Sequence, residues 1–315
     1  RFDLRRLVRD RDFCLLLGMN YVIQRAKEAG IHSELKPVPS LPLGSSDALL
    51  LGMALLCQFF LQGRVFPFGE TEEPRQAAII KEIRTVDGEV IYRGTSGWRQ
   101  LVAPWVAASV GRILRGAGSD GTGKRGNEYS PLTSPDKARQ AEIAPFAAYI
   151  PLMGKTGTTN DYINAAFVGF LPTLPGGEEG TVAGFPYGSG LTVAAYVGYD
   201  DNHAMRRKSI RLDGASGALP AWLETTLAIS RGMDISRRLD LAELAFTQKP
   251  TSYGNIIMPI LWPTEMEIQT IDPVSGVLLD PDLLEDPGKG EPYELFVDPL
   301  TQEIRARYQP FHPGQ

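Results

Sequence analysis

Three consecutive β-prone segments between residues 154 and 199 constrain the fold of this chain more than any other feature. The first, Gly-Lys-Thr-Gly-Thr-Thr at 154–159, favours a strand because threonine is enriched in strands. Two apolar runs follow, one at 165–171 and one at 191–199. Pro172 stops the first run, and a Gly/Pro-rich loop over 172–190 separates the two. Short apolar runs bounded by turn residues are typical of strands. The region therefore predicts a sheet rather than a helical fold.

Helical periodicity is present on both sides of these strands. The helical segments are residues 13–29, 48–61, 101–115 and 220–229. In the first, we expect Leu16, Tyr21, Ile23 and Ala26 on the apolar face and Gly30 just beyond the end. Strands and helices together predict an α/β (α+β) fold.

The helix predicted at 48–61 is the longest apolar run of the chain. A membrane-spanning helix needs about 20 apolar residues, so we expect this shorter segment to be a buried core helix. Ser45, Ser46 and Asp47 precede it as candidate N-caps. For the helix at 101–115, Pro104 fits the first turn.

Turn residues predict the remaining organisation. Two β-rich runs within 79–92 flank Asp87-Gly88, a signal for a type I′ hairpin. The Pro-rich segment 36–42 predicts an extended linker, and the Gly-, Ser-, Asp- and Lys-rich segment 116–140 predicts a loop. Beyond residue 233, pairs such as Asp272-Pro273 and Ser275-Gly276 separate short β-like runs, so we expect a β-rich tail there, most clearly over 250–315.

Composition excludes several classes of protein. The 33 glycines and 24 prolines are too many for a coiled coil, and no Gly-X-Y period indicates collagen. A net charge of −5 predicts no nucleic-acid partner. Cys14 and Cys57 lie in apolar segments, where we expect small core residues rather than a disulfide. His32, His203 and His312 are scattered, so we expect neither a metal site nor a cofactor.

The start of the chain gives one further expectation. It begins at Arg1 rather than at methionine and shows no signal peptide, so we expect a piece of a longer protein. Any membrane anchor would then lie upstream of Arg1. Residues 1–12 are strongly charged and form the first of three expected parts, followed by 13–232 and 233–315.

The segment from Gly154 to Asp161 is the strongest candidate site. A phosphate-binding loop would need a glycine six residues before Lys155, but that position is Tyr149, and Pro145 and Pro151 interrupt the neighbourhood. The sequence therefore argues against a phosphate loop.

A Lys-Thr-Gly strand explains the same residues better. Lys155 supplies a positive charge, and the hydroxyls of Thr156 and Thr158 can hold a carboxylate. Glycine weakens a strand unless another backbone must approach closely, which Gly157 would permit for an extended peptide. The plainer interpretation is a polar edge strand on which lysine prevents unwanted pairing.

The surrounding residues resemble one family. Residues 154–162, followed by Ala-Ala-Phe-Val-Gly-Phe at 165–170, resemble the transpeptidase domain of class A penicillin-binding proteins, the bifunctional peptidoglycan synthases. Further segments resemble that domain in the expected order, namely 17–31, 39–46, 86–92, 197–202 and 214–222. The resemblance covers roughly residues 13–230. It implies an incomplete penicillin-binding-protein/β-lactamase-like transpeptidase fold, with an antiparallel sheet flanked by helices and a small β-rich tail.

The resemblance also implies a mechanism and a set of partners. In the family, the serine of a Ser-x-x-Lys motif attacks the D-Ala-D-Ala bond of a peptidoglycan stem peptide, and an amine of a second peptide resolves the acyl-enzyme. Lys155 would supply the positive field and the N–H of Thr158 one oxyanion-hole donor, while Thr156, Thr158, Thr159 and Asn160 would bind substrate. Partners would be stem peptides, lipid-linked precursors and β-lactams. The location would be the extracytoplasmic face of the cytoplasmic membrane.

The chain departs from the family at its nucleophile. Ser-x-x-Lys occurs at Ser33–Lys36 and Ser134–Lys137, but neither predicts a buried helix start, so we expect coincidences. Ser-x-Asn is absent from the sequence, and Tyr253-Gly254-Asn255 is a variant in the wrong order. Ala166 stands where the family has a large aromatic residue.

Two hypotheses follow from these departures. The first is part of a D,D-transpeptidase that lacks its serine motif and is inactive alone. The second is a non-catalytic scaffold that binds cell-wall peptide or a protein partner.

Overall fold

A three-stranded antiparallel sheet organises the larger part of the molecule. Its order is β6 (Met153–Thr158), β7 (Asn164–Pro172) and β9 (Gly190–Gly198). The central strand β7 is buried from Phe167 onward, which explains its nearly continuous apolar sequence. All three predicted strands are confirmed. The ends of β7 and β9 differ by one residue from the predicted runs 165–171 and 191–199.

The computed structural model covers most of the chain. The described residues are 10–66, 80, 82–93, 98–119, 121–123, 126, 129–176, 180–243, 256–263, 267–271, 278–279, 291–297 and 304–308. The chain forms two compact units, Arg1–Leu261 and Trp262–Gln315. Among these residues, no helix has both the length and the hydrophobicity needed to cross a membrane.

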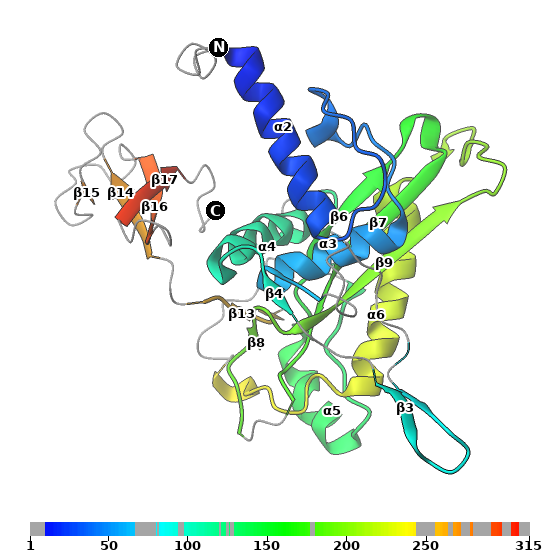
Figure 1. The fold of residues 1–315 in the computed structure, drawn as a ribbon. Coiled ribbons are helices and arrows are strands. Elements are labelled where there is room, and N and C mark those ends of the chain that lie inside the picture. Colours follow the sequence, from blue (N-terminus) through cyan, green and yellow to red (C-terminus); the bar gives the residue numbers. More distant parts are fainter. Residues whose placement is uncertain are drawn as a thin grey trace. The chain divides into compact units, whose positions relative to one another are not determined.

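Helices pack against the central sheet (Figure 1). Both α3 (Leu50–Gln62) and α6 (Leu219–Met233) contact β7 and β9. From α6, the Trp222 ring packs edge-on against Phe167, with 5.0 Å between ring centroids, and its indole N–H donates to the Val193 carbonyl. This mixed α/β arrangement, with antiparallel strands and flanking helices, is compatible with the predicted class.

Helix α2 (Arg11–Glu28) has well-formed ends. The Asp10 carboxylate accepts a hydrogen bond from the Phe13 N–H, and Gly30, at φ +110°, follows the C-cap. The Gly30 and Ile31 N–H groups donate to the Lys27 and Ala26 carbonyls, which is a Schellman ending. Gly30 therefore ends the helix as predicted.

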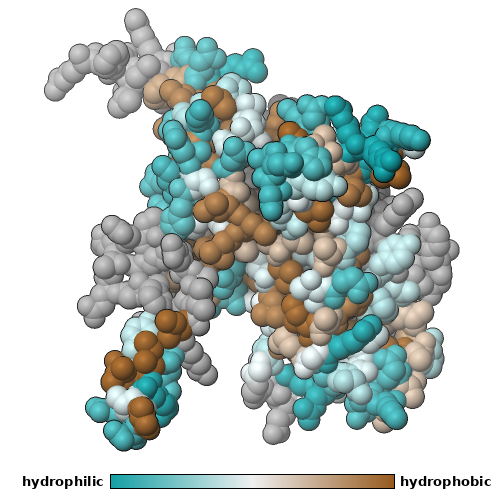
Figure 2. Space-filling view, turned by 90° about the vertical axis from the view of Figure 1, so that its right-hand side faces the viewer, coloured by the Kyte–Doolittle hydropathy of each residue, from teal (hydrophilic) through white to brown (hydrophobic). Residues whose placement is uncertain are grey.

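The apolar face of α2 differs from the prediction. Met19 and Ile23 are buried, but Leu16 and Tyr21 are 46% and 59% exposed. Cys14 is exposed as well, so its prediction as a core residue is wrong. The contacts with α3 are made just beyond the helix end, where Gly30 lies against Leu55 and Ile31 against Gly52. Figure 2 shows hydrophobic patches between hydrophilic side chains on one face of the molecule.

Helix α3 confirms the predicted core helix but not its cap. Cys57 is buried on it, and burial raises the pKa of this thiol to about 12. The helix starts at Leu50, so its N-cap is Leu49 rather than Ser45, Ser46 or Asp47. The Leu49 N–H donates to the Ser33 hydroxyl, 3.2 Å away.

The linker and the hairpin were predicted correctly in outline. Within 36–42 the chain is non-helical up to one 3₁₀ turn, η1 (Leu41–Leu43), which Gly44 ends. The hairpin pairs β2 (Glu82–Arg84) with β3 (Val90–Arg93). Its turn is not type I′, because a type I′ turn needs positive φ at both central residues and the φ of Asp87 is not positive. Instead the Gly88 N–H donates to the Thr85 carbonyl, and Gly88 alone is left-handed.

The segment predicted as a loop at 116–140 is helical at both ends. Helix α4 (Pro104–Ser119) has Pro104 in its first turn as predicted, but it begins three residues after the predicted start at 101 and runs past residue 115. Helix α5 (Lys137–Ile143) begins after Asp136, whose carboxylate accepts from the Arg139 N–H. The remaining short elements are β1 (Arg64–Val65), β4 (Arg99–Gln100), β10 (Arg206–Arg207), β11 (Ile210–Arg211), η3 (Ala144–Phe146), η4 (Asn160–Tyr162) and η5 (Gly214–Ala218).

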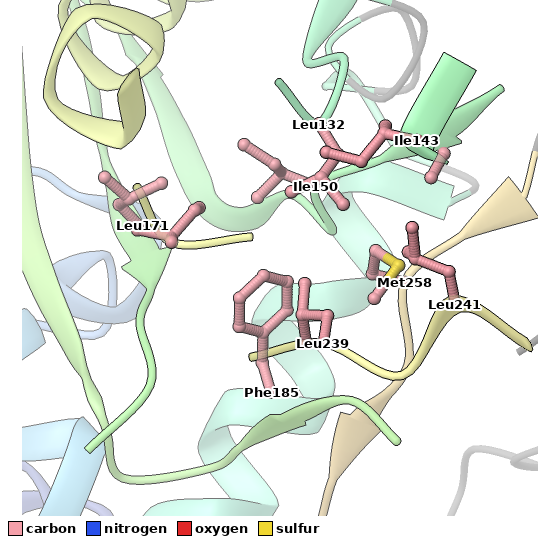
Figure 3. Packing of buried hydrophobic residues seen from close by; sticks show 10 residues of the cluster. Leu132, Ile143, Ile150, Leu171, Phe185, Leu239, Leu241 and Met258 are labelled. Atoms are coloured by element: carbon pink, nitrogen blue, oxygen red, sulfur yellow. The ribbon is translucent and has the colours of Figure 1, made fainter. Parts of the chain in front are cut away.

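A hydrophobic cluster within the first unit packs the residues that follow α6 against the rest of that unit (Figure 3). Here β12 (Ile256–Ile257) pairs with β5 (Ala148–Tyr149), and β13 (Ile260–Leu261) pairs with β8 (Phe185–Pro186). Phe185, Leu239 and Met258 are almost completely buried together. These contacts lie within the compact unit that extends to Leu261.

The second unit contains an antiparallel sheet of order β15-β14-β16-β17. Its strands are β14 (Glu267–Ile271), β15 (Leu278–Leu279), β16 (Glu291–Val297) and β17 (Ile304–Tyr308). These strands agree with the predicted β-rich tail. The turn pairs predicted at 272–273 and 275–276, the charged residues 1–9, the variant motif at 253–255 and His312 lie outside the described residues.

Candidate functional site

The predicted site residues lie together at the exposed end of β6. Met153 and Gly154 are buried, but Lys155, Gly157 and Thr158 are exposed. In the described part of the chain, β6 is an edge strand that pairs only with β7. The strand therefore passes from the core to the surface within two residues.

The hydrogen-bond pattern shows which backbone groups face the open edge. The Thr159 N–H donates to the Asn164 carbonyl, 3.0 Å away, so these two residues form a hydrogen-bonded pair. Bonded and non-bonded pairs alternate along an antiparallel ladder, which turns the N–H and C=O groups of Thr156 and Thr158 outward. The Lys155 ammonium donates to the Thr156 carbonyl, 2.9 Å away, and so lies at this edge.

The two threonines share one face of the sheet. They pair with Phe167 and Ala165, which lie in the hydrophobic cluster beneath α6. The Thr158 hydroxyl accepts a hydrogen bond of 3.0 Å from the Gly214 N–H, which leaves its own proton free to donate.

The Thr156 hydroxyl has a partner from a different segment. It lies 2.8 Å from the hydroxyl of Thr122, which follows α4. Thr122 was missed because it lies in a segment predicted only as a loop, and no motif distinguishes it there.

Three glycines at or beside β6 differ in the space around them. A Cβ on Gly154 would lie 2.6 Å from the Val168 carbonyl, and one on Gly214 would lie 2.8 Å from the Gly157 carbonyl. A Cβ on Gly157 would meet nothing closer than the Ala166 Cβ at 3.7 Å. Packing among the described residues therefore requires glycine at 154 and 214 but not at 157.

Thr159 and Asn160 begin the turn that leaves β6. The Thr159 hydroxyl accepts from the Asn164 N–H at 2.8 Å, so it closes the turn, while Asn160 is exposed. Asp161 and Tyr162 follow with φ of 59° and 60°, a left-handed conformation that is uncommon for residues other than glycine. The turn is thus held in a strained shape beside the candidate site.

Asp213 fixes the helix start that contacts Thr158. Its carboxylate accepts from the N–H groups of Ala215 and Ser216 at 2.9 and 2.8 Å. Burial alone would raise the pKa of Asp213, but the hydrogen bonds from Ser216 and Ala215 outweigh it, and the pKa is lowered. The sequence resemblance at 214–222 included this helix start but did not identify Asp213.

The two Ser-x-x-Lys matches have structural roles. The Ser33 hydroxyl caps α3 through the Leu49 N–H, and Ser134 donates to the Asp234 carboxylate at 2.9 Å. Neither serine lies in a helix with its lysine one turn away, because Lys36 lies in the linker and Ser134 precedes α5. Within the described ranges, no group of three or more His, Cys, Asp or Glu residues is placed to hold a metal ion.

The chain has a relative among characterised proteins. No protein-family model matches it. It is similar to Penicillin-binding protein 1A of Aquifex aeolicus (strain VF5), with 24% identity over 217 residues, which is 68% of this chain and 23% of that protein. The chain thus spans about a quarter of the length of that relative. This similarity supports a relation to penicillin-binding proteins in general and does not identify a class or a domain.

Proposed function

We propose that this chain provides the Lys-Thr-Gly side of a peptidoglycan D,D-transpeptidase site. The observation that supports the proposal is the outward-facing edge of β6, where the Thr158 N–H, the Thr156 carbonyl and the Lys155 ammonium lie together. An extended stem peptide ending in D-Ala-D-Ala would add to this edge as an antiparallel strand.

The side chains would then bind the end of the peptide. Lys155 supplies the positive charge, and the hydroxyls of Thr156 and Thr158 donate to the terminal carboxylate. The Thr158 N–H is placed to stabilise an oxyanion, which is the role of an oxyanion-hole donor. β-Lactams and lipid-linked precursors carrying the same peptide would be further ligands, at the extracytoplasmic face of the membrane.

A second function is favoured by the serines. Because Ser33 and Ser134 are both bound to structural partners, the described residues offer no activated nucleophile of the Ser-x-x-Lys type. A scaffold that binds cell-wall peptide without turnover is consistent with this arrangement.

Peptide titration tests the binding site directly. In an NMR titration of the 315-residue chain, a peptide ending in D-Ala-D-Ala with a free carboxylate should shift the Thr158 amide signal. The same peptide with an amidated C-terminus should not shift it. Lys155→Ala should abolish the shift, whereas Lys36→Ala, which removes an exposed lysine from the linker, should preserve it. Equal responses to acid and amide peptides would contradict the proposed carboxylate site.

Labelled penicillin tests for a nucleophile and separates the two functions. We expect no covalent adduct on this chain, and an adduct on Ser33 or Ser134 by mass spectrometry would overturn that expectation. In a longer parent that carries the serine motifs, Lys155→Ala should lower the acylation rate by orders of magnitude. A parent that binds peptide but is never acylated would be the scaffold.

A further inference from the structure

The hairpin formed by β10 and β11 concentrates positive charge. Arg206, Arg207, Lys208 and Arg211 lie within six residues, all exposed, in a chain of net charge −5. General basicity therefore does not explain the cluster.

The pairing of this hairpin is electrostatically unfavourable. Arg206 lies directly opposite Arg211, and like charges opposite each other destabilise a strand pair. Among the described residues, its one ion pair joins Arg206 to the Asp161 carboxylate at 3.3 Å, and the Arg211 guanidinium lies over the Tyr162 ring, 5.5 Å from its centroid. That carboxylate pairs with Arg206 alone, and within the described part of the chain Arg207, Lys208 and Arg211 form no ion pair, so their charges are open to a ligand.

The hairpin is attached to the end of the candidate site. The Met205 N–H, just before β10, donates to the Tyr162 carbonyl at 2.7 Å, and Asp161 and Tyr162 belong to the turn that directly follows β6. The basic cluster therefore lies beyond the C-terminal end of β6.

Strand direction relates this cluster to a bound peptide. A peptide that pairs antiparallel with β6 and places its carboxyl end at Lys155 and Thr156 runs toward residues 158–162 with its N-terminal part. The residues upstream of D-Ala-D-Ala thus approach the hairpin.

We propose that the β10–β11 hairpin binds a carboxylate in the upstream part of the peptide held by β6. The inference rests on the proposed function and adds a preference for acidic peptides. Arginine guanidinium groups bind carboxylates through paired hydrogen bonds, and Arg207 and Lys208 add charge at the turn.

Two matched peptides test the preference. Both end in D-Ala-D-Ala, and the second residue before that pair is glutamate in one and glutamine in the other. We expect the glutamate peptide to bind about threefold to tenfold more tightly in calorimetry at low salt, as a few exposed ion pairs allow, with the difference decreasing as salt rises.

Charge-matched variants locate the effect. Arg207→Gln with Lys208→Gln should remove most of the preference, and Lys36→Gln with Lys137→Gln, which removes the same charge from exposed positions elsewhere, should retain it. Circular dichroism checks that both variants are folded.

The outcomes separate this inference from the proposed function. Equal binding of the two peptides by the unmodified chain overturns the hairpin's role but leaves the β6 site intact. If neither peptide binds, both proposals fail. Binding of phosphatidylglycerol vesicles through the hairpin, without a peptide preference, would also overturn the inference in favour of a lipid surface.

Discussion

Strands β6 and β7 are paired residue by residue but differ in what surrounds them. β7 is buried from Phe167 to Pro172, whereas β6 becomes exposed at Lys155, opposite the buried Val168. The comparison shows that one ladder supports two different environments. β7 fixes the position of β6 through the core, and β6 presents polar groups at an open edge.

The largest expected effect is in the core beneath this ladder. Phe167 pairs with Thr156 and packs against Trp222. Phe167→Ala should lower the free energy of unfolding by about 3–5 kcal/mol, because it removes buried surface and leaves a cavity. Urea unfolding followed by circular dichroism measures this, and Phe167→Leu is the milder control. A loss below about 1 kcal/mol would show that β7 is not the support of the site.

The two glycines of β6 give a sharper comparison within one strand. Gly154→Ala should destabilise the protein by about 1–3 kcal/mol, because the new methyl overlaps the Val168 carbonyl. Gly157→Ala should change stability by no more than about 0.5 kcal/mol. Thermal unfolding distinguishes the two, and the peptide titration should show weaker binding for Gly157→Ala. Similar losses of stability at both positions would contradict the different packing of the strand's two ends.

The strands and helices were predictable because their signals are local. The apolar runs of β7 and β9, the Thr-rich segment of β6 and the C-terminal glycine of α2 each indicate their structure from sequence periodicity or backbone preference alone. The candidate site residues Lys155 to Thr158 were predicted as a group because they form one short motif, Lys-Thr-Gly-Thr, that is continuous in the sequence.

The features that sequence could not predict depend on contacts between distant segments. Ser33 caps α3 across 16 residues, and Thr122 contacts Thr156 across 34. The exposure of Leu16 and Tyr21 depends on how much of α2 is covered, which periodicity does not report. The predicted turn type of the β2–β3 hairpin was wrong because Asp87-Gly88 is compatible with more than one turn geometry.

Asp213, which caps the helix start next to Thr158, should make the stability of the protein depend on pH. Its pKa is lowered in the folded chain, so its stabilising contribution is present above the unfolded pKa of about 3.9 and is lost as pH falls through the folded value. Asp213→Ala should cost about 1 kcal/mol at pH 7, as loss of an N-cap does. Asp213→Asn can still cap but does not titrate, so its stability should fall less than that of the parent between about pH 5 and 2. Parallel pH profiles for the parent and Asp213→Asn would show that this carboxylate does not stabilise the helix start.

The smallest effect on stability, and the most informative for function, is expected at Lys155. Its side chain is exposed, and the bond to the Thr156 carbonyl is its one described contact, so substitutions should change the free energy of unfolding by no more than about 0.5 kcal/mol. A lysine that merely protects an open edge can be replaced by another charge, because either sign disfavours edge-to-edge pairing. A lysine that binds a carboxylate cannot be replaced by glutamate. Lys155→Glu should therefore sediment as the parent does and lose peptide binding, whereas Lys155→Arg should retain part of that binding. If Lys155→Glu binds the peptide as the parent does, the charge on β6 is edge protection and the polar end of this strand is not a carboxylate site.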